Sequence, residues 1–199
     1  MAGRKKSGFN KNLRPKREYK SKMIISAEGK KTEVEYFECL KNYSNYIIEV
    51  LNRSPGRSSP TKVLDDLKQR IGNNLLTKKD EAWIVIDVDQ WLQEEIDEVI
   101  NYVKTNQKYH CAISNPKFEY WLLLHFEYPN KSLSSNECNY ALKKYIPYYN
   151  KGVPSSKITK ENIREAIKNA RRRHNSNEYD YPKNNGTTVY LLVEKIIEQ

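Results

Sequence analysis

Acidic residues follow three apolar runs of the chain, at the points where the strands of a sheet would end. In an open parallel sheet, the carboxyl ends of the strands share one edge, so these acids would meet there. Clustered carboxylates repel one another, and a divalent cation such as Mg²⁺ removes that repulsion through hard oxygen ligands. Such a centre activates water and stabilises charge on a phosphodiester. The four acids are Glu28, Asp87, Asp89 and Glu119.

Simpler interpretations of these acids stay open. Acids after strands also cap helices, and Asp-x-Asp alone is a weak motif. Side chains alternate along a strand, so Asp87 and Asp89 face one site only if the chain turns between them. Glu33 and Glu35 fit the first turn of a helix, where the helix dipole favours acids.

The elements that must position these acids alternate between strand and helix. Apolar runs predict buried strands at 23–27, 83–86 and 109–114, a pattern typical of a parallel sheet covered on both faces. We therefore expect an α/β, Rossmann-like fold, with a mainly parallel sheet flanked by helices and a helical C-terminal part from about residue 130. The helices are expected at 32–51 (capped by Thr32, with Phe37, Leu40, Ile47 and Leu51 as its apolar stripe), 64–75, 92–103, 115–126 (capped by Asn115, with Pro116 first), 134–146, 159–173 and 189–197.

The positive charge of the chain is concentrated at its start. The 199 residues carry a net charge of +10, and residues 1–22 hold nine Lys and Arg against one Glu, which leaves +2 for the rest. We expect residues 1–21 to be a basic disordered arm and residues 22–199 to form a single domain. Such an arm binds nucleic acid through its phosphates or is simply a solvated terminus.

Composition and length exclude several classes of protein. A hydrophobic content of 38% argues against wholesale disorder. No apolar stretch approaches the roughly 20 residues of a membrane helix, and no signal peptide is visible. The three cysteines lack zinc-finger spacing and favour a reducing cytosol, so we expect a cytoplasmic protein without membrane contact.

Three segments resemble the motifs of the RloB-like family, a small branch of the Toprim fold related to OLD-type nucleases. The first is Glu28-Gly29-Lys30-Lys31-Thr32-Glu33, followed by Tyr36-Phe37, and the second is Asp87-Val88-Asp89. The third, 114–126 (SNPKFEYWLLLHF), is the most distinctive, and the closing helix 187–193 is also similar. The resemblance spans roughly residues 22–198.

The resemblance implies a Mg²⁺- or Mn²⁺-dependent enzyme that handles nucleic-acid phosphates. It implies Asp87 and Asp89 as metal ligands and Glu28 as a metal ligand or general acid/base. Glu33 is similar to the last residue of the Glu-Gly-x-Thr-Glu motif of OLD-type nucleases and is a further metal candidate, although this chain has one extra residue before Thr32. An association with restriction loci and an ABC- or AAA-type ATPase partner is also implied, hence an anti-phage role in bacteria.

Other side chains are candidates for supporting roles. Lys30 and Lys31 lie beside the acids and could hold a phosphate as point charges, or be ordinary exposed lysines. Glu119 is a further ligand or a residue that orients these lysines. The cluster Arg171, Arg172 and Arg173 favours a helix C-terminus and could also grip a nucleic-acid backbone. His125 fits a core histidine better than a catalytic one, and some of the fifteen tyrosines could stack on bases.

The sequence thus supports two hypotheses. The first is a metal-dependent nuclease, with Glu28, Lys30, Lys31 and Glu119 as catalytic residues and Glu28, Glu33, Asp87 and Asp89 as metal ligands. The second is a nucleic-acid-binding or effector subunit of an ATPase-containing defence complex, with little activity alone. DNA and RNA, with tRNA among the candidates, and the oligomeric state are left open.

Overall fold

The computed structural model describes residues 20–52, 59–72, 76–174 and 180–198. Within them, one sheet has the strand order β2-β1-β3-β4-β5, and every neighbouring pair is parallel except β4 and β5. This arrangement confirms the predicted α/β, Rossmann-like class. The strands are β1 (Lys22–Ala27), β2 (Ile47–Val50), β3 (Glu81–Asp87), β4 (Tyr109–Asn115) and β5 (Gly186–Thr187).

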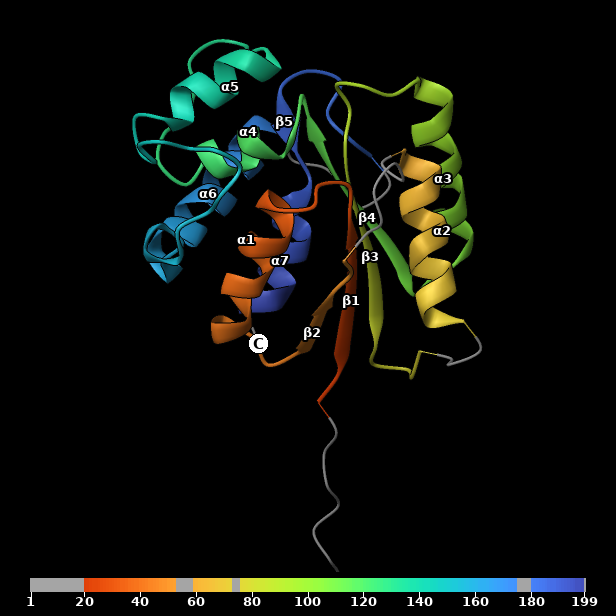
Figure 1. Ribbon diagram of the computed structural model, residues 1–199. Coiled ribbons are helices and arrows are strands. Elements are labelled where there is room, and N and C mark those ends of the chain that lie inside the picture. The colour runs from red at the N-terminus through yellow and green to blue at the C-terminus, as the bar shows by residue number, and fades with distance from the viewer. Residues whose placement is uncertain (1–19, 53–58, 73–75, 175–179, 199) are drawn as a thin grey trace, which may run out of the picture.

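Helices cover both faces of the sheet (Figure 1). One face carries α2 and α3, and the other carries α1 and α7, with α4, α5 and α6 on that same side. The helices are α1 (Thr32–Leu40), α2 (Pro60–Ile71), α3 (Gln93–Thr105), α4 (Phe118–Leu123), α5 (Ser135–Leu142), α6 (Lys160–Arg173) and α7 (Val189–Ile197), with short 3-10 helices η1 (Lys41–Tyr43) and η2 (Ser155–Lys157).

The central strand β3 is buried on both faces, which explains its uninterrupted apolar sequence. Trp83 and Val85 pack into the core formed with α1 and α7. Ile84 and Ile86 point the other way and pack into the core formed with α2 and α3. This alternation is the two-residue period of a strand, with both faces covered.

The sequence prediction was wrong about the segment after α1. We expected one helix with Ile47 and Leu51 on its apolar stripe, but α1 ends at Leu40, and Ile47–Val50 forms the edge strand β2. β2 pairs with β1 in parallel, and Ile48 is buried while Ile47 is half exposed. The helical spacing of the apolar residues was accidental, because an edge strand of four residues is too short to show a clear period of two.

The prediction was also wrong about the starts of two helices. Asn115 ends β4 and joins Pro116 through a cis peptide bond. Helix α4 begins at Phe118, with Lys117 as its N-cap residue. Thr32 is the first residue of α1 rather than its cap. Pro116 is not the first residue of a helix. Its carbonyl accepts hydrogen bonds from the segment after β3, so Pro116 lies at the edge of the sheet.

Three further details complete the comparison. Strand β5 is only two residues long and had no signal in the sequence. The basic arm falls almost wholly outside the described residues, as does Leu75. Throughout the described part of the chain, no helix is both long enough and apolar enough to cross a membrane.

We predict that the same Leu→Ala substitution has different effects on the free energy of unfolding in the core and at the surface. Leu67→Ala, in the fully buried face of α2, should lower the free energy of unfolding by about 2–5 kcal/mol, because it leaves a cavity. Leu92→Ala should change it by less than about 0.5 kcal/mol, since Leu92 is 70% exposed despite its place in the expected apolar stripe. Urea unfolding measures both values, and equal losses would contradict this packing.

Candidate active site

Glu28 extends the pairing of β1 and β3 by one residue. Its backbone N–H donates to the Val85 carbonyl at 2.9 Å, and its carboxylate accepts from two donors. The Asp87 backbone N–H lies 3.1 Å from Oε2, and the Trp91 indole N–H lies 2.9 Å from Oε1. The half-buried Glu28 carboxylate is therefore held against the end of β3.

Glu33 is brought to the same edge by the first turn of α1. Its side chain is buried, and Oε1 accepts from the Gly29 backbone N–H at 3.1 Å. A Cβ atom on Gly29 would lie only 1.9 Å from Glu33 Oε2. A side chain at position 29 would therefore displace the Glu33 carboxylate from its present position.

The chain turns at the end of β3, as a shared site for the two aspartates requires. The backbone N–H groups of Val88 and Asp89 donate to the Pro116 carbonyl at 3.2 and 3.1 Å. Asp87 is half-buried, whereas Asp89 is exposed, and Asp89 Oδ2 accepts from the Ser135 hydroxyl at 2.6 Å. Asp89 therefore lies toward the start of α5, at the margin of the group.

Glu119 comes from the first turn of α4 and is buried. Its Oε1 accepts from the Tyr149 hydroxyl at 3.0 Å, and its Oε2 lies 3.8 Å from Lys117 Nζ. The Tyr149 hydroxyl is also within 3.2 Å of Thr32 Oγ1, the first residue of α1. A buried hydrogen-bonded chain thus links Glu119 to the helix that carries Glu33.

Burial and repulsion from neighbouring acids raise the pKa values of three of the carboxyl groups, those of Glu28, Glu33 and Asp87. The pKa of Glu28 is raised to about 7, chiefly by burial. The hydrogen bonds from Asp87 and Trp91 lower this pKa, and the charges of Glu33 and Asp89 raise it further. The pKa of Glu33 is also raised to about 7, by burial first and by the charge of Glu119 second.

Burial and the charges of all three other acids, Glu33, Glu28 and Glu119, raise the pKa of Asp87 well above its ordinary value. A hydrogen bond from the Phe118 backbone acts against this rise. The four residues Glu28, Glu33, Asp87 and Glu119, from three β–α junctions, therefore form one electrostatically coupled group, which we call the acidic cluster.

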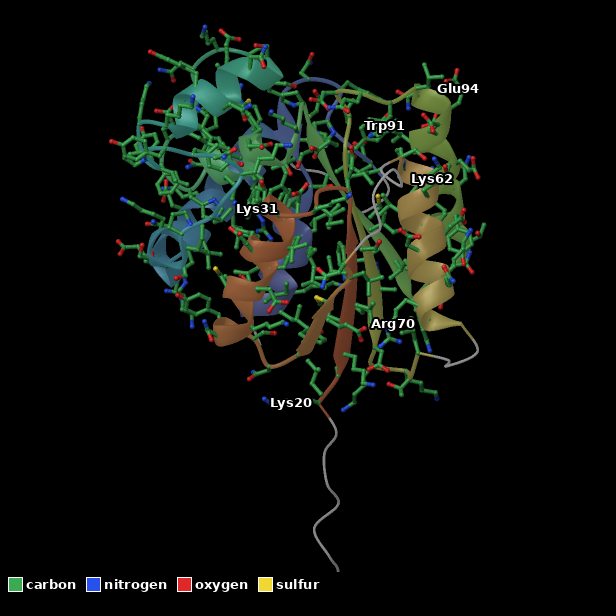
Figure 2. All side chains as sticks on the ribbon, viewed as in Figure 1. Lys20, Lys31, Lys62, Arg70, Trp91 and Glu94 are labelled. Carbon is green, nitrogen blue, oxygen red and sulfur yellow. The ribbon has the colours of Figure 1, made fainter. Side chains whose placement is uncertain are left out.

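The predicted cationic residues are more dispersed. Lys30 and Lys31 are exposed in the turn before and at the start of α1, and Lys31 lies toward the 146–154 loop. Figure 2 labels Lys31 and Trp91 near the same end of the sheet. The three arginines at the end of α6 contact their own chain. Arg171 pairs with Glu194, Arg172 and Arg173 lie over the Tyr128 ring, and Arg173 also donates to the Pro129 carbonyl.

Four residues at the site were not predicted to act there. Trp91 and Lys117 each lie two residues from a predicted acid, so their spacing was an available signal. Tyr149 and Lys151 come from a loop far along the chain, and nothing in their local sequence indicates contact with α1. The charge of Lys151 lowers the pKa of Glu33, against the larger effect of burial.

His125 has the structural role that its apolar surroundings indicated. The ring is almost fully buried, with Nδ1 3.1 Å from the Trp121 carbonyl and Nε2 3.1 Å from the Tyr36 hydroxyl. A carbonyl only accepts, so Nδ1 carries the proton and Nε2 accepts from Tyr36. Burial lowers the pKa of His125 to about 4, which keeps the ring neutral.

The donor chemistry of the acidic cluster fits a hard divalent cation. Its side chains offer only carboxylate oxygens, which Mg²⁺ and Mn²⁺ prefer, and a cation would offset the repulsion between them. Each of Glu28, Glu33 and Glu119 also accepts a hydrogen bond from the protein. In the described part of the chain, no group of three or more His, Cys, Asp or Glu side chains is already arranged to hold a metal ion.

A mainly parallel, Rossmann-like sheet with acids at its carboxyl edge defines the class of this protein. The family model described as RloB-like protein matches residues 23–196, nearly the whole chain. The chain therefore belongs to the RloB-like family. No curated protein and no solved structure gives a significant match.

We predict that Glu33→Gln changes how stability depends on pH in the absence of metal ions. The pKa of Glu33 is about 7 in the folded protein and near 4.5 when unfolded, so the folded state holds a proton that the unfolded state releases. This contribution is complete below pH 4.5 and is lost as the pH rises through about 7. As the pH rises from about 5 to 8, the free energy of unfolding of Glu33→Gln should increase relative to that of the wild type by on the order of 2 kcal/mol.

Urea unfolding in a chelator, at a series of pH values, measures this difference. The lowered pKa of His125 affects the pH dependence of stability in the opposite direction. Both proteins contain His125, so its effect cancels in the difference between them. The exposed Glu98→Gln on α3 is the matched control and should follow the wild type at every pH. Parallel curves for Glu33→Gln and the wild type would show that Glu33 does not titrate in the way its burial requires.

Proposed function

We propose that this protein is a metal-dependent nuclease that hydrolyses phosphodiester bonds of DNA or RNA. The observation that carries the proposal is the acidic cluster: carboxylates from three β–α junctions meet at one sheet edge, where burial and neighbouring negative charges raise the pKa values of Glu28, Glu33 and Asp87. A fold does not need this repulsion, and groups with strongly perturbed pKa values concentrate at functional sites.

Specific roles follow for the residues of the cluster. Glu28 and Asp87 would hold Mg²⁺ or Mn²⁺, with Glu33 and Asp89 as further ligands. A bound ion of this kind activates water and stabilises charge on the phosphodiester oxygens. Glu28, with a pKa of about 7, is also suited to exchange a proton near neutral pH when no metal is bound.

The remaining site residues would support this chemistry. Glu119 is fixed by Tyr149 and lies beside Lys117, so it would position the cluster rather than act alone. Lys30 and Lys31 are exposed near the cluster and would hold the phosphate. The resemblance to the RloB-like family supports a role in anti-phage defence with an ATPase partner, and the cysteine pattern favours the cytoplasm.

We predict that Asp87→Asn reduces Mg²⁺- or Mn²⁺-dependent cleavage by about 100-fold or more, because electrostatic stabilisers of a transition state typically contribute this much. Cleavage of plasmid DNA and of a tRNA pool by the purified protein measures the effect and identifies the substrate class. Titration calorimetry with Mn²⁺ should show weaker metal binding in the same variant.

Asp65→Asn is the matched control for this experiment. Asp65 is an exposed aspartate on α2, outside the acidic cluster, so the substitution should leave cleavage and Mn²⁺ binding unchanged. Wild-type cleavage that persists in Asp87→Asn would rule out the proposed site. Cleavage by neither protein would favour the second candidate function.

The second candidate is a nucleic-acid-binding or effector subunit with little activity alone. It is favoured by one observation: the cluster carboxylates are engaged by protein donors, and the described residues hold no ready-made metal group. In such a protein, a partner such as the expected ATPase would complete the site. Cleavage assays with and without that partner separate the two functions.

We predict that the basic N-terminal segment supplies phosphate contacts in either case. Deletion of residues 1–19, which carry seven Lys and Arg and one Glu, removes six net positive charges. If several of these contact phosphates, the slope of log Kd against log salt should become shallower by about 0.7–0.9 for each lost contact. Fluorescence anisotropy with a labelled oligonucleotide measures the slope, and an unchanged slope would exclude the segment from binding.

A further inference from the structure

The loop 146–154, between α5 and η2, is fixed against the first motif although more than 100 residues separate them. The Thr32 hydroxyl donates to the Lys151 carbonyl at 3.1 Å, and the Val153 backbone N–H donates to Glu35 Oε2 at 2.7 Å. Tyr149 adds the contact with Glu119 described above. The loop therefore reaches from α1 to the acidic cluster.

Adjacent tyrosines of this loop have opposite environments. Tyr149 is buried and touches the cluster, whereas Tyr148 is 96% exposed. The φ angle of Tyr148 is +64°, a left-handed conformation that bulky residues rarely adopt. The backbone of the loop thus presents one ring inward to the acids and holds the next ring out in solvent.

Tyr148 borders a pocket of about 310 Å³, at the lower end of the range of ligand clefts. Besides Tyr148, its lining residues include Lys31, Glu35 and Asn150. Lys31 Nζ and Glu35 Oε2 lie 3.7 and 3.6 Å from the position that a Cβ on Gly152 would take, so both charged groups flank the loop.

This combination matches the chemistry of a nucleotide. An aromatic face stacks on any base, an ammonium group pairs with a phosphate, and amide and carboxylate groups accept or donate at a base edge. An exposed tyrosine alone would be unremarkable on a protein surface, but here it borders a pocket whose polar groups lie beside it.

We propose that this pocket binds one nucleobase of a single-stranded nucleic acid, with Tyr148 stacked on the base and Lys31 at the adjoining phosphate. The inference rests on the proposed function and deepens it, since it names the strand-holding residues beside the acidic cluster. Tyr148 adjoins Tyr149, whose hydroxyl contacts Glu119, so the proposed base site is on the loop that also contacts the acidic cluster. The substrate class is therefore single-stranded or locally unpaired nucleic acid.

The test is binding of a single-stranded oligonucleotide of about 12 nucleotides, measured in a chelator so that cleavage plays no part. The full chain is titrated into an oligonucleotide with a fluorescent adenine analogue and into an abasic oligonucleotide of the same length. Tyr148→Ala should weaken binding of the first by about 10-fold and leave the weaker binding of the second unchanged. Tyr148→Phe should retain wild-type affinity, because it keeps the ring.

Two controls separate stacking from charge and from general surface effects. Tyr140→Ala removes another exposed tyrosine, on α5, that does not line the pocket, and should bind as the wild type does. Lys31→Ala should make the slope of log Kd against log salt shallower by the amount expected for about one lost phosphate contact. Tyr148→Ala should leave this slope unchanged.

The outcomes distinguish this inference from the proposed function. Equal affinity of the wild type and Tyr148→Ala overturns it, as does an equal loss on the abasic oligonucleotide. Failure of the wild type to bind either oligonucleotide also overturns it and leaves the exposed ring as a contact for a protein partner. Tyr148-dependent binding by a chain that never cleaves with Mg²⁺ supports the pocket and refutes only the nuclease.

Discussion

The parallel pairing of β1 with β3 is the constraint on which the acidic cluster depends. Ala27 is opposite Val85, and the next residue, Glu28, places its carboxylate on the backbone N–H of Asp87. A register shift of one residue would turn the apolar side chains of β1 to the wrong faces and separate these two acids. The packing of two cores against β3 thus also sets the distance between Glu28 and Asp87.

The cluster is electrostatically unfavourable, and the surrounding structure keeps it together. The Gly29 backbone, the Trp91 indole and the Tyr149 hydroxyl donate to its carboxylates, and Lys117 and Lys151 lie near enough to act on them. These donors favour the charged carboxylates, but burial and the remaining repulsion still keep the pKa values of Glu28 and Asp87 raised. A site that still calls for positive charge is suited to a cation and to the phosphates that accompany it.

Several parts of the fold could be predicted from the sequence because local pattern decides them. The runs that form β1, β3 and β4 are buried on both faces, so most of their residues are apolar whatever their neighbours. The edge strands β2 and β5 are short, and their pairing rather than their composition makes them strands. Leu92 fitted the spacing of a buried helix face yet is exposed, because it lies just before α3 begins.

The sequence by itself determined which acids stand at strand ends, because parallel strands share the edge at which they finish. Only the tertiary structure decided which of them lie together: Glu119 and Glu33 lie inside the cluster, while Asp89 is at its margin near Ser135. The structure also brought Tyr149 to the cluster, on a loop whose neighbouring residue, Tyr148, is exposed. Contacts between residues more than 100 positions apart depend on how layers pack, and no local spacing records them.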